Sequence, residues 1–64
     1  AALSDREREI CVLLAGGVTT ATAAVRMHLA ESTVKTHLRS AEAKLGVASR
    51  AELAIIIDRA GLLP

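Results

Sequence analysis

The residues best suited to chemistry lie between positions 32 and 44, where basic and hydroxyl side chains recur every three or four residues. At that spacing Lys35, Thr36 and Arg39 share one side of a helix, with Ser32 at the near end of that side. A guanidinium or ammonium group donates to O6 and N7 of guanine, and a threonine methyl group contacts the methyl group of thymine. The pattern therefore predicts a base-reading face, with Arg39 as the first candidate for a guanine.

A second row of polar side chains runs beside this face at helical spacing: Thr33, His37, Ser40 and Lys44. On a helix lying against DNA, such a flank would follow one phosphate strand. Each residue alone has a simpler explanation, because polar groups on the outer side of an amphipathic helix are usually only solvated. A histidine beside an apolar stripe, such as His37, is more often packed than functional. The surrounding elements therefore decide the interpretation.

The charge of the chain is unevenly distributed. The net charge of the 64 residues is only +1, which alone does not indicate nucleic acid. Residues 32–50, however, carry four basic residues and one acidic residue. Residues 1–31 carry three basic and four acidic residues, and residues 51–64 carry one basic and two acidic residues. A local basic excess is what phosphate binding requires.

Other chemistries find little support. The single cysteine, Cys11, lies in an apolar run and is expected to be a buried, inert thiol in a reducing, cytoplasmic setting. His28 and His37 have no cysteine or carboxylate partners at metal-ligand spacing. Ser4 and Ser49 are expected to cap helices, and neither has an evident base. We therefore expect no catalytic residues, no metal site, no cofactor and no membrane segment.

Caps and apolar periodicity predict an all-α fold, a single domain over residues 1–64 with helices at 5–15, 20–27, 31–45 and 50–60. Ser4 and Glu7 predict a capping box at the first helix, and Ser49 with Glu52 a second box at the fourth. Threonine hydroxyls precede the second helix, and glycines follow the first, third and fourth.

The third helix has two distinct sides. Its apolar stripe lies opposite the base-reading face and consists of Val34, Leu38, Ala41 and Leu45. Two short helices joined by a tight turn, the second with one apolar and one basic side, form a helix-turn-helix. The second helix of that motif fits the major groove of B-DNA. The helix at 31–45 is therefore the expected recognition helix.

The fourth helix also has two apolar sides. Its expected buried stripe is Leu53, Ile56, Ile57 and Ala60. A second strip points away from the first and consists of Ala51, Ile55 and Leu62. A monomer would expose this second strip to water, which marks it as a candidate contact surface.

Several fragments, in this order and spacing, resemble the LuxR-type (GerE-like) DNA-binding domain over nearly the whole chain. They are Leu3-Ser4-Asp5-Arg6-Glu7, Gly17, Thr33-Val34-Lys35-Thr36-His37-Leu38, Lys44-Leu45-Gly46-Val47 and Ser49-Arg50-Ala51-Glu52-Leu53. The resemblance implies a four-helix domain of a bacterial transcriptional regulator with a central helix-turn-helix. It also implies sequence-specific binding of double-stranded DNA in the cytoplasm, with RNA polymerase as a further candidate partner.

The resemblance also implies roles for individual residues. Positions matching Lys35, Thr36 and Arg39 face the bases, and those matching Thr20, Thr33, His37 and Lys44 approach the backbone. The strip of Ala51, Ile55 and Leu62 becomes a candidate homodimer seam, on paired half-sites about one helical turn apart. Two other functions remain open: a promoter-reading domain like that of sigma factors, and a helical protein-interaction module without DNA binding.

Several positions depart from the family pattern. Thr20 stands where an asparagine is common, Ala23 replaces an isoleucine and Met27 a leucine. Ala30 replaces the serine that usually caps the third helix, so a side-chain acceptor is missing there. Ser32 could take over this cap by starting the helix later, in which case it would not contact a base.

Overall fold

The computed structural model describes residues 3–61, which form four α-helices and no strand. They are α1 (Asp5–Ala15), α2 (Thr20–Met27), α3 (Glu31–Leu45) and α4 (Arg50–Arg59). The all-α architecture is confirmed, and α1, α2 and α3 have the predicted bounds. α4 ends at Arg59, one residue earlier than expected, with Ala60 as its C-cap. No helix within residues 3–61 combines the length and apolar character needed to cross a membrane.

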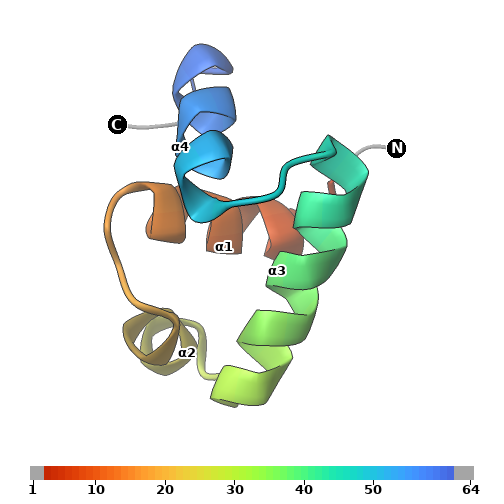
Figure 1. Cartoon of the computed structure of the whole chain (residues 1–64). Helices are drawn as coiled ribbons and strands as arrows, with labels where there is room; N and C mark the ends of the chain where they lie inside the picture. The colour runs from red at the N-terminus through yellow and green to blue at the C-terminus, as the bar shows by residue number, and fades with distance from the viewer. Residues whose placement is uncertain (1–2, 62–64) are drawn as a thin grey trace.

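The helix α1 lies at the centre of the fold and packs against each of the other three (Figure 1). α2 and α3 also contact each other on one side of α1, and α4 packs on α1 from the opposite side. α3 is the longest element and extends along one edge of the molecule. This arrangement leaves the outer side of α3 uncovered by any other described helix.

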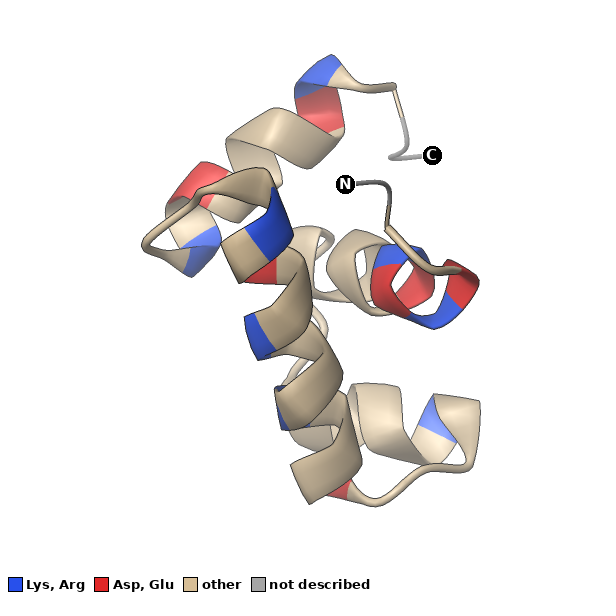
Figure 2. Ribbon diagram, turned by 90° about the vertical axis from the view of Figure 1, so that its right-hand side faces the viewer, with Lys and Arg blue, Asp and Glu red and all other residues tan. Residues whose placement is uncertain are grey.

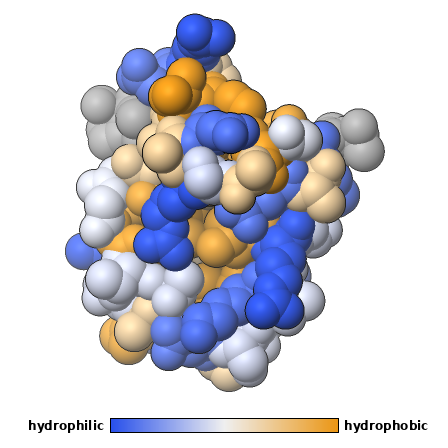
Figure 3. All heavy atoms as spheres, in the orientation of Figure 1, coloured by the Kyte–Doolittle hydropathy of each residue, from blue (hydrophilic) through white to orange (hydrophobic). Residues whose placement is uncertain are grey.

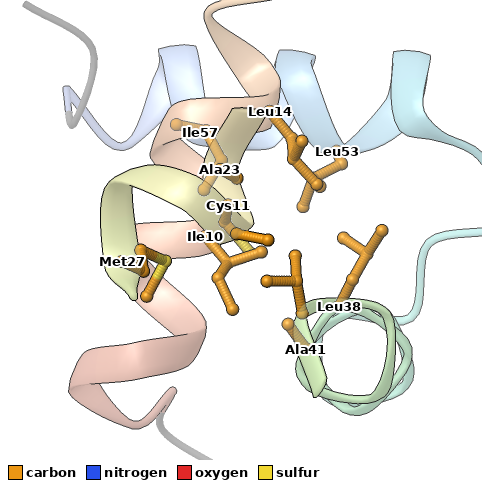
Figure 4. Packing of buried hydrophobic residues seen from close by; sticks show 11 residues of the cluster. Ile10, Cys11, Leu14, Ala23, Met27, Leu38, Ala41, Leu53 and Ile57 are labelled. Carbon is orange, nitrogen blue, oxygen red and sulfur yellow. The ribbon is translucent and has the colours of Figure 1, made fainter. Parts of the chain in front are cut away.

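One apolar core joins all four helices (Figure 4). Its buried members are Ile10, Cys11, Leu14, Ala23, Ala24, Met27, Val34, Leu38, Ala41, Leu53 and Ile57. Cys11 is buried as predicted, and burial raises the pKa of its thiol, with smaller contributions from Glu42 and Glu7. The core stripe of α3 is confirmed for Val34, Leu38 and Ala41, while Leu45 at the helix end is half-buried.

The expected stripe of α4 was partly wrong. Leu53 and Ile57 are fully enclosed, Ile56 is half-buried, and Ala60 is exposed. The reason is geometric, because α4 is supported mainly by α1 and its buried side covers little more than one turn.

The two predicted capping boxes differ. At α1 the box is complete, since Ser4 Oγ accepts from the Glu7 amide at 3.2 Å and Glu7 Oε1 accepts from the Ser4 amide at 2.8 Å. At α4, Ser49 Oγ accepts from the Glu52 amide at 3.2 Å, but Glu52 Oε2 accepts from the amide of Ala48 at 3.3 Å. The second box is therefore only half formed. The φ of Ser49 is −147°, against −70° at Ser4, which turns its own amide away.

The start of α3 shows that Ser32 does not cap this helix. The N-cap is Ala30, which has no side-chain acceptor, and its carbonyl accepts from the amides of Thr33 at 3.0 Å and Val34 at 3.1 Å. The backbone alone closes this first turn. Ser32 lies inside the helix, so a later start capped by Ser32 is wrong. At the other end Gly46 adopts φ 70°, a left-handed conformation that glycine reaches without strain.

Candidate nucleic-acid interface

The outer side of α3 carries the four residues predicted to read bases. Ser32, Lys35, Thr36 and Arg39 are all exposed, whereas the opposite side of the helix is held in the core. Basic residues recur along α3, with an acidic residue at its first turn (Figure 2). In the space-filling view, hydrophilic side chains cover the surface over α3, while hydrophobic atoms gather near α4 (Figure 3). The polar side of α3 is thus accessible, while the apolar side holds the helix against the core.

The two cations of this face have different surroundings. Lys35 Nζ lies 3.9 Å from Glu31 Oε2, and the two side chains are 55% and 45% exposed. A pair of this kind on a helix surface is worth only about 0.3–0.5 kcal/mol, so the ammonium can leave it at little cost. Arg39 forms no ion pair with any residue that the structure describes. Both cations are therefore available to an external acceptor.

Thr36 uses its hydroxyl within the helix. Its Oγ1 donates to the carbonyl oxygen of Ser32 at 3.0 Å. The hydroxyl proton is thus occupied, and the side chain offers its methyl group and the lone pairs of its oxygen. An apolar contact to a thymine methyl group suits this state of Thr36.

The flank beside this face is less uniform than its sequence pattern indicated. Thr33 and His37 are half-buried and Ser40 is exposed. Thr20, at the start of α2, donates from Oγ1 to Glu31 Oε2 at 2.7 Å, which ties the first turns of α2 and α3 together. The amide cap of α2 is supplied by Thr19, whose Oγ1 accepts from the Thr22 amide at 3.1 Å.

Lys44 has a partner that sequence reasoning missed. Its Nζ donates to Glu7 Oε1 at 2.8 Å, and the Glu7 residue is only 3% exposed. The Lys44 ammonium, together with the backbone amide of Ser4 and the side chain of Ser40, lowers the pKa of Glu7 to about 2. The pair links the first turn of α1 to the last turn of α3. It thereby fixes one end of α3 and offsets much of the charge of Lys44.

A sequence signal for a buried Glu7 did exist. Glu7 lies three, four and seven residues before Ile10, Cys11 and Leu14, so it falls on the buried side of α1. Its assignment as a capping residue accounted for its carboxylate and hid this second role.

The turn between α2 and α3 completes the helix-turn-helix. His28, the C-cap of α2, has φ 58° and ψ 41°. Its amide donates to the carbonyl of Val25 at 3.3 Å, and the amide of Leu29 donates to the carbonyl of Ala24 at 2.9 Å. These bonds close α2 and direct the chain into α3 within three residues, from 28 to 30.

The second apolar strip of α4 is partly described. Ala51 is exposed, and Ile55 is 54% exposed, one of two large hydrophobic side chains so accessible among the described residues. Leu62 lies outside the described residues. The strip is thus uncovered in this chain, as far as the structure describes it.

Comparisons with known proteins agree with this architecture. Residues 1–57 match the family of bacterial regulatory proteins of the luxR family. The probable HTH-type transcriptional regulator GfsR of Streptomyces halstedii is 49% identical over 51 residues, covering 80% of this chain and 21% of GfsR. The spore germination protein GerE of Bacillus subtilis (strain 168) is 38% identical over 61 residues, covering 95% of this chain and 82% of GerE. The chain thus spans about a fifth of the length of GfsR and most of that of GerE.

Proposed function

Because the chain belongs to the LuxR family and is a DNA-binding domain of the transcription-regulator type, we propose that it binds double-stranded DNA sequence-specifically with α3 in the major groove. One observation carries this proposal. Three side chains able to contact base edges, Lys35, Thr36 and Arg39, are exposed on one side of α3, while its other side is buried. A rigid helix with outward donors is what base recognition in the groove requires.

Within this proposal the roles follow from the surroundings of each residue. Arg39, which has no ion pair among the described residues, donates to a guanine, and Lys35 donates to a neighbouring base after leaving Glu31. The Thr36 methyl group contacts a thymine, and Ser32 lies at the entry of α3. The backbone contacts come from Thr33, His37, Ser40 and Lys44, and from the start of α2 at Thr20, whose hydroxyl proton stays on Glu31 Oε2. Lys44 contributes least of these, because Glu7 already offsets its charge.

We further propose that the domain binds as a dimer on paired half-sites. The support is the uncovered apolar strip on α4, with Ile55 54% exposed. Two copies related by a two-fold axis would bury it, and their recognition helices would reach grooves about one helical turn apart.

The test combines site selection with salt dependence. The chain is used to select duplexes from a random library, and its affinity for the selected duplex is measured over a range of salt concentrations. We expect log affinity to fall with log salt by about 0.9 per phosphate neutralised. Flat salt dependence, or no binding at any salt, would refute the proposal and favour a protein-interaction module.

Arg39→Ala then tests the assignment of the base contact. We expect preference at one position of each half-site to fall by about 5- to 150-fold, the equivalent of roughly 1–3 kcal/mol. Arg8→Ala, an exposed arginine on α1, is the matched control and should leave that preference unchanged. Equal losses on selected and random DNA would show that Arg39 contacts phosphate rather than a base.

A further inference from the structure

A negative charge lies at the tip of the helix that would enter the groove. Glu31 is the first residue of α3, and its side chain is 45% exposed. The other acidic residue of α3, Glu42, is half-buried near the far end. A carboxylate brought among phosphates weakens binding to any DNA unless it finds a hydrogen-bond donor there. Glu31 therefore either weakens the binding of DNA or accepts a hydrogen bond from a donor on the DNA.

The carboxylate of Glu31 is held in place by one oxygen. Oε2 accepts from Thr20 Oγ1 at 2.7 Å and lies 3.9 Å from Lys35 Nζ. Oε1 accepts no hydrogen bond from the residues that the structure describes. The side chain is thus oriented from α2 and from the next turn of α3, while one acceptor remains open.

The donor that fits this acceptor in the major groove is the N4 amino group of cytosine, which glutamate and aspartate accept from. Glu31 and Lys35 are one helical turn apart, a rise of about 6 Å. Successive bases along a strand are about 3.4 Å apart, so the two side chains reach bases within about two steps of each other.

Resting on the proposed function, we propose that Glu31 is a specificity-determining residue that accepts the N4–H of a cytosine in each half-site. Thr20 is its positioning residue. Oε1 makes the contact, and Oε2 stays on the Thr20 hydroxyl. The cytosine lies within about two base pairs of the base that Lys35 contacts.

The experiment compares the wild-type chain with Glu31→Ala on the duplex selected from the random library. Affinity is measured for that duplex and for the same duplex with the C·G pair replaced by a T·A pair. It is also measured for a duplex in which a cytosine analogue that lacks the N4 amino group replaces the cytosine. For the wild type we expect a loss of at least about fivefold on both changes. For Glu31→Ala we expect the three affinities to be equal. Circular dichroism checks that the helices are retained.

Two further variants separate this role from a general charge effect. Glu9→Ala removes an exposed carboxylate from α1 and should leave the cytosine preference unchanged. Thr20→Val removes the hydroxyl that holds Oε2 and should reduce the preference while leaving α2 capped by Thr19.

The outcomes distinguish the two proposals. If the wild type selects a site without such a cytosine, or if Glu31→Ala raises affinity for all three duplexes equally, Glu31 only repels phosphate and this inference is overturned. If the wild type binds no duplex at any salt, the proposed function fails and this inference fails with it.

Discussion

The turn between α2 and α3 contains strain that one substitution should remove. Of the non-glycine residues described, only His28 has a positive φ, 58°. For a residue with a Cβ this left-handed conformation costs about 1–2 kcal/mol, because Cβ lies close to the following carbonyl oxygen. Glycine avoids that cost, but it gives the unfolded chain more conformational freedom, and losing this freedom on folding costs about 0.4–1 kcal/mol. His28→Gly should therefore stabilise the domain by about 0.8 kcal/mol.

Nothing else in the structure opposes this gain. His28 is exposed, and its ring makes no hydrogen bond with a described residue. Its backbone amide, which donates to the Val25 carbonyl at 3.3 Å, is retained in the variant. In a domain of this size, the gain corresponds to a rise in Tm of about 3–6 °C.

The assay is thermal unfolding followed by circular dichroism, for the wild type, His28→Gly and His28→Ala. The alanine variant is the matched control, because it deletes the ring but keeps the strained Cβ. It should stay close to the wild type. If alanine stabilises as much as glycine, the imidazole rather than the backbone carries the cost. A lower Tm for His28→Gly would refute the strain argument itself.

Two further predictions concern the ion pair and α4. Because the Lys44 ammonium holds the pKa of Glu7 at about 2, below its ordinary value of 4.5, the stabilisation by charged Glu7 is complete above about pH 4.5 and is lost as the pH falls through about 2. Glu7→Gln should lower the thermal denaturation midpoint at neutral pH. Between about pH 4.5 and 2, the midpoint of this variant should fall less than that of the wild type. An unchanged acid profile would contradict the stabilising role assigned to the Glu7–Lys44 pair. Ile55→Glu should weaken two-copy assembly on paired half-sites without unfolding the chain, because Ile55 is 54% exposed. Gel-shift stoichiometry and circular dichroism test this, and intact assembly or global unfolding would count against the α4 seam.

Much of the fold was predictable because its determinants are local. Ser4 and Gly46 mark helix ends through bonds and backbone angles confined to a few neighbouring residues. The stripe of Val34, Leu38 and Ala41 depends only on helical spacing, so it identified the buried side of α3 and hence its outer side. The orientation of the candidate interface follows from these local patterns.

The unpredicted features depend on tertiary geometry. Glu7 and Lys44 are 37 residues apart, and only the packing of α1 on α3 brings them together. The exposure of Ala60 depends on how much of α4 its support covers. At Ser49 the sequence motif is the same as at Ser4, but a different φ redirects one hydrogen bond. Helical spacing places Glu7 on the buried side of α1, but residue types and spacing do not identify its partner, the extent of α4 that α1 covers, or the φ of Ser49.

The ion pairs also show how a chain of net charge +1 accommodates the DNA-reading helix that we propose. In α3, Lys44 is paired with Glu7 at 2.8 Å and Lys35 lies near Glu31 at 3.9 Å, so of the basic residues in this helix only Arg39 has no carboxylate partner in the described chain. The charge of Lys44 is offset by the buried Glu7 and adds little to phosphate attraction, which is the part of affinity that carries no sequence information, whereas the exposed Lys35–Glu31 pair opens at little cost. Binding by α3 must then depend in larger part on the contacts made to base edges. This predicts a salt dependence that is measurable but shallower than three free cations would give, together with strong discrimination between selected and random DNA. A steep salt slope with weak discrimination would mean that the Lys44–Glu7 pair also opens on DNA and that Glu7 does not set the charge of the interface.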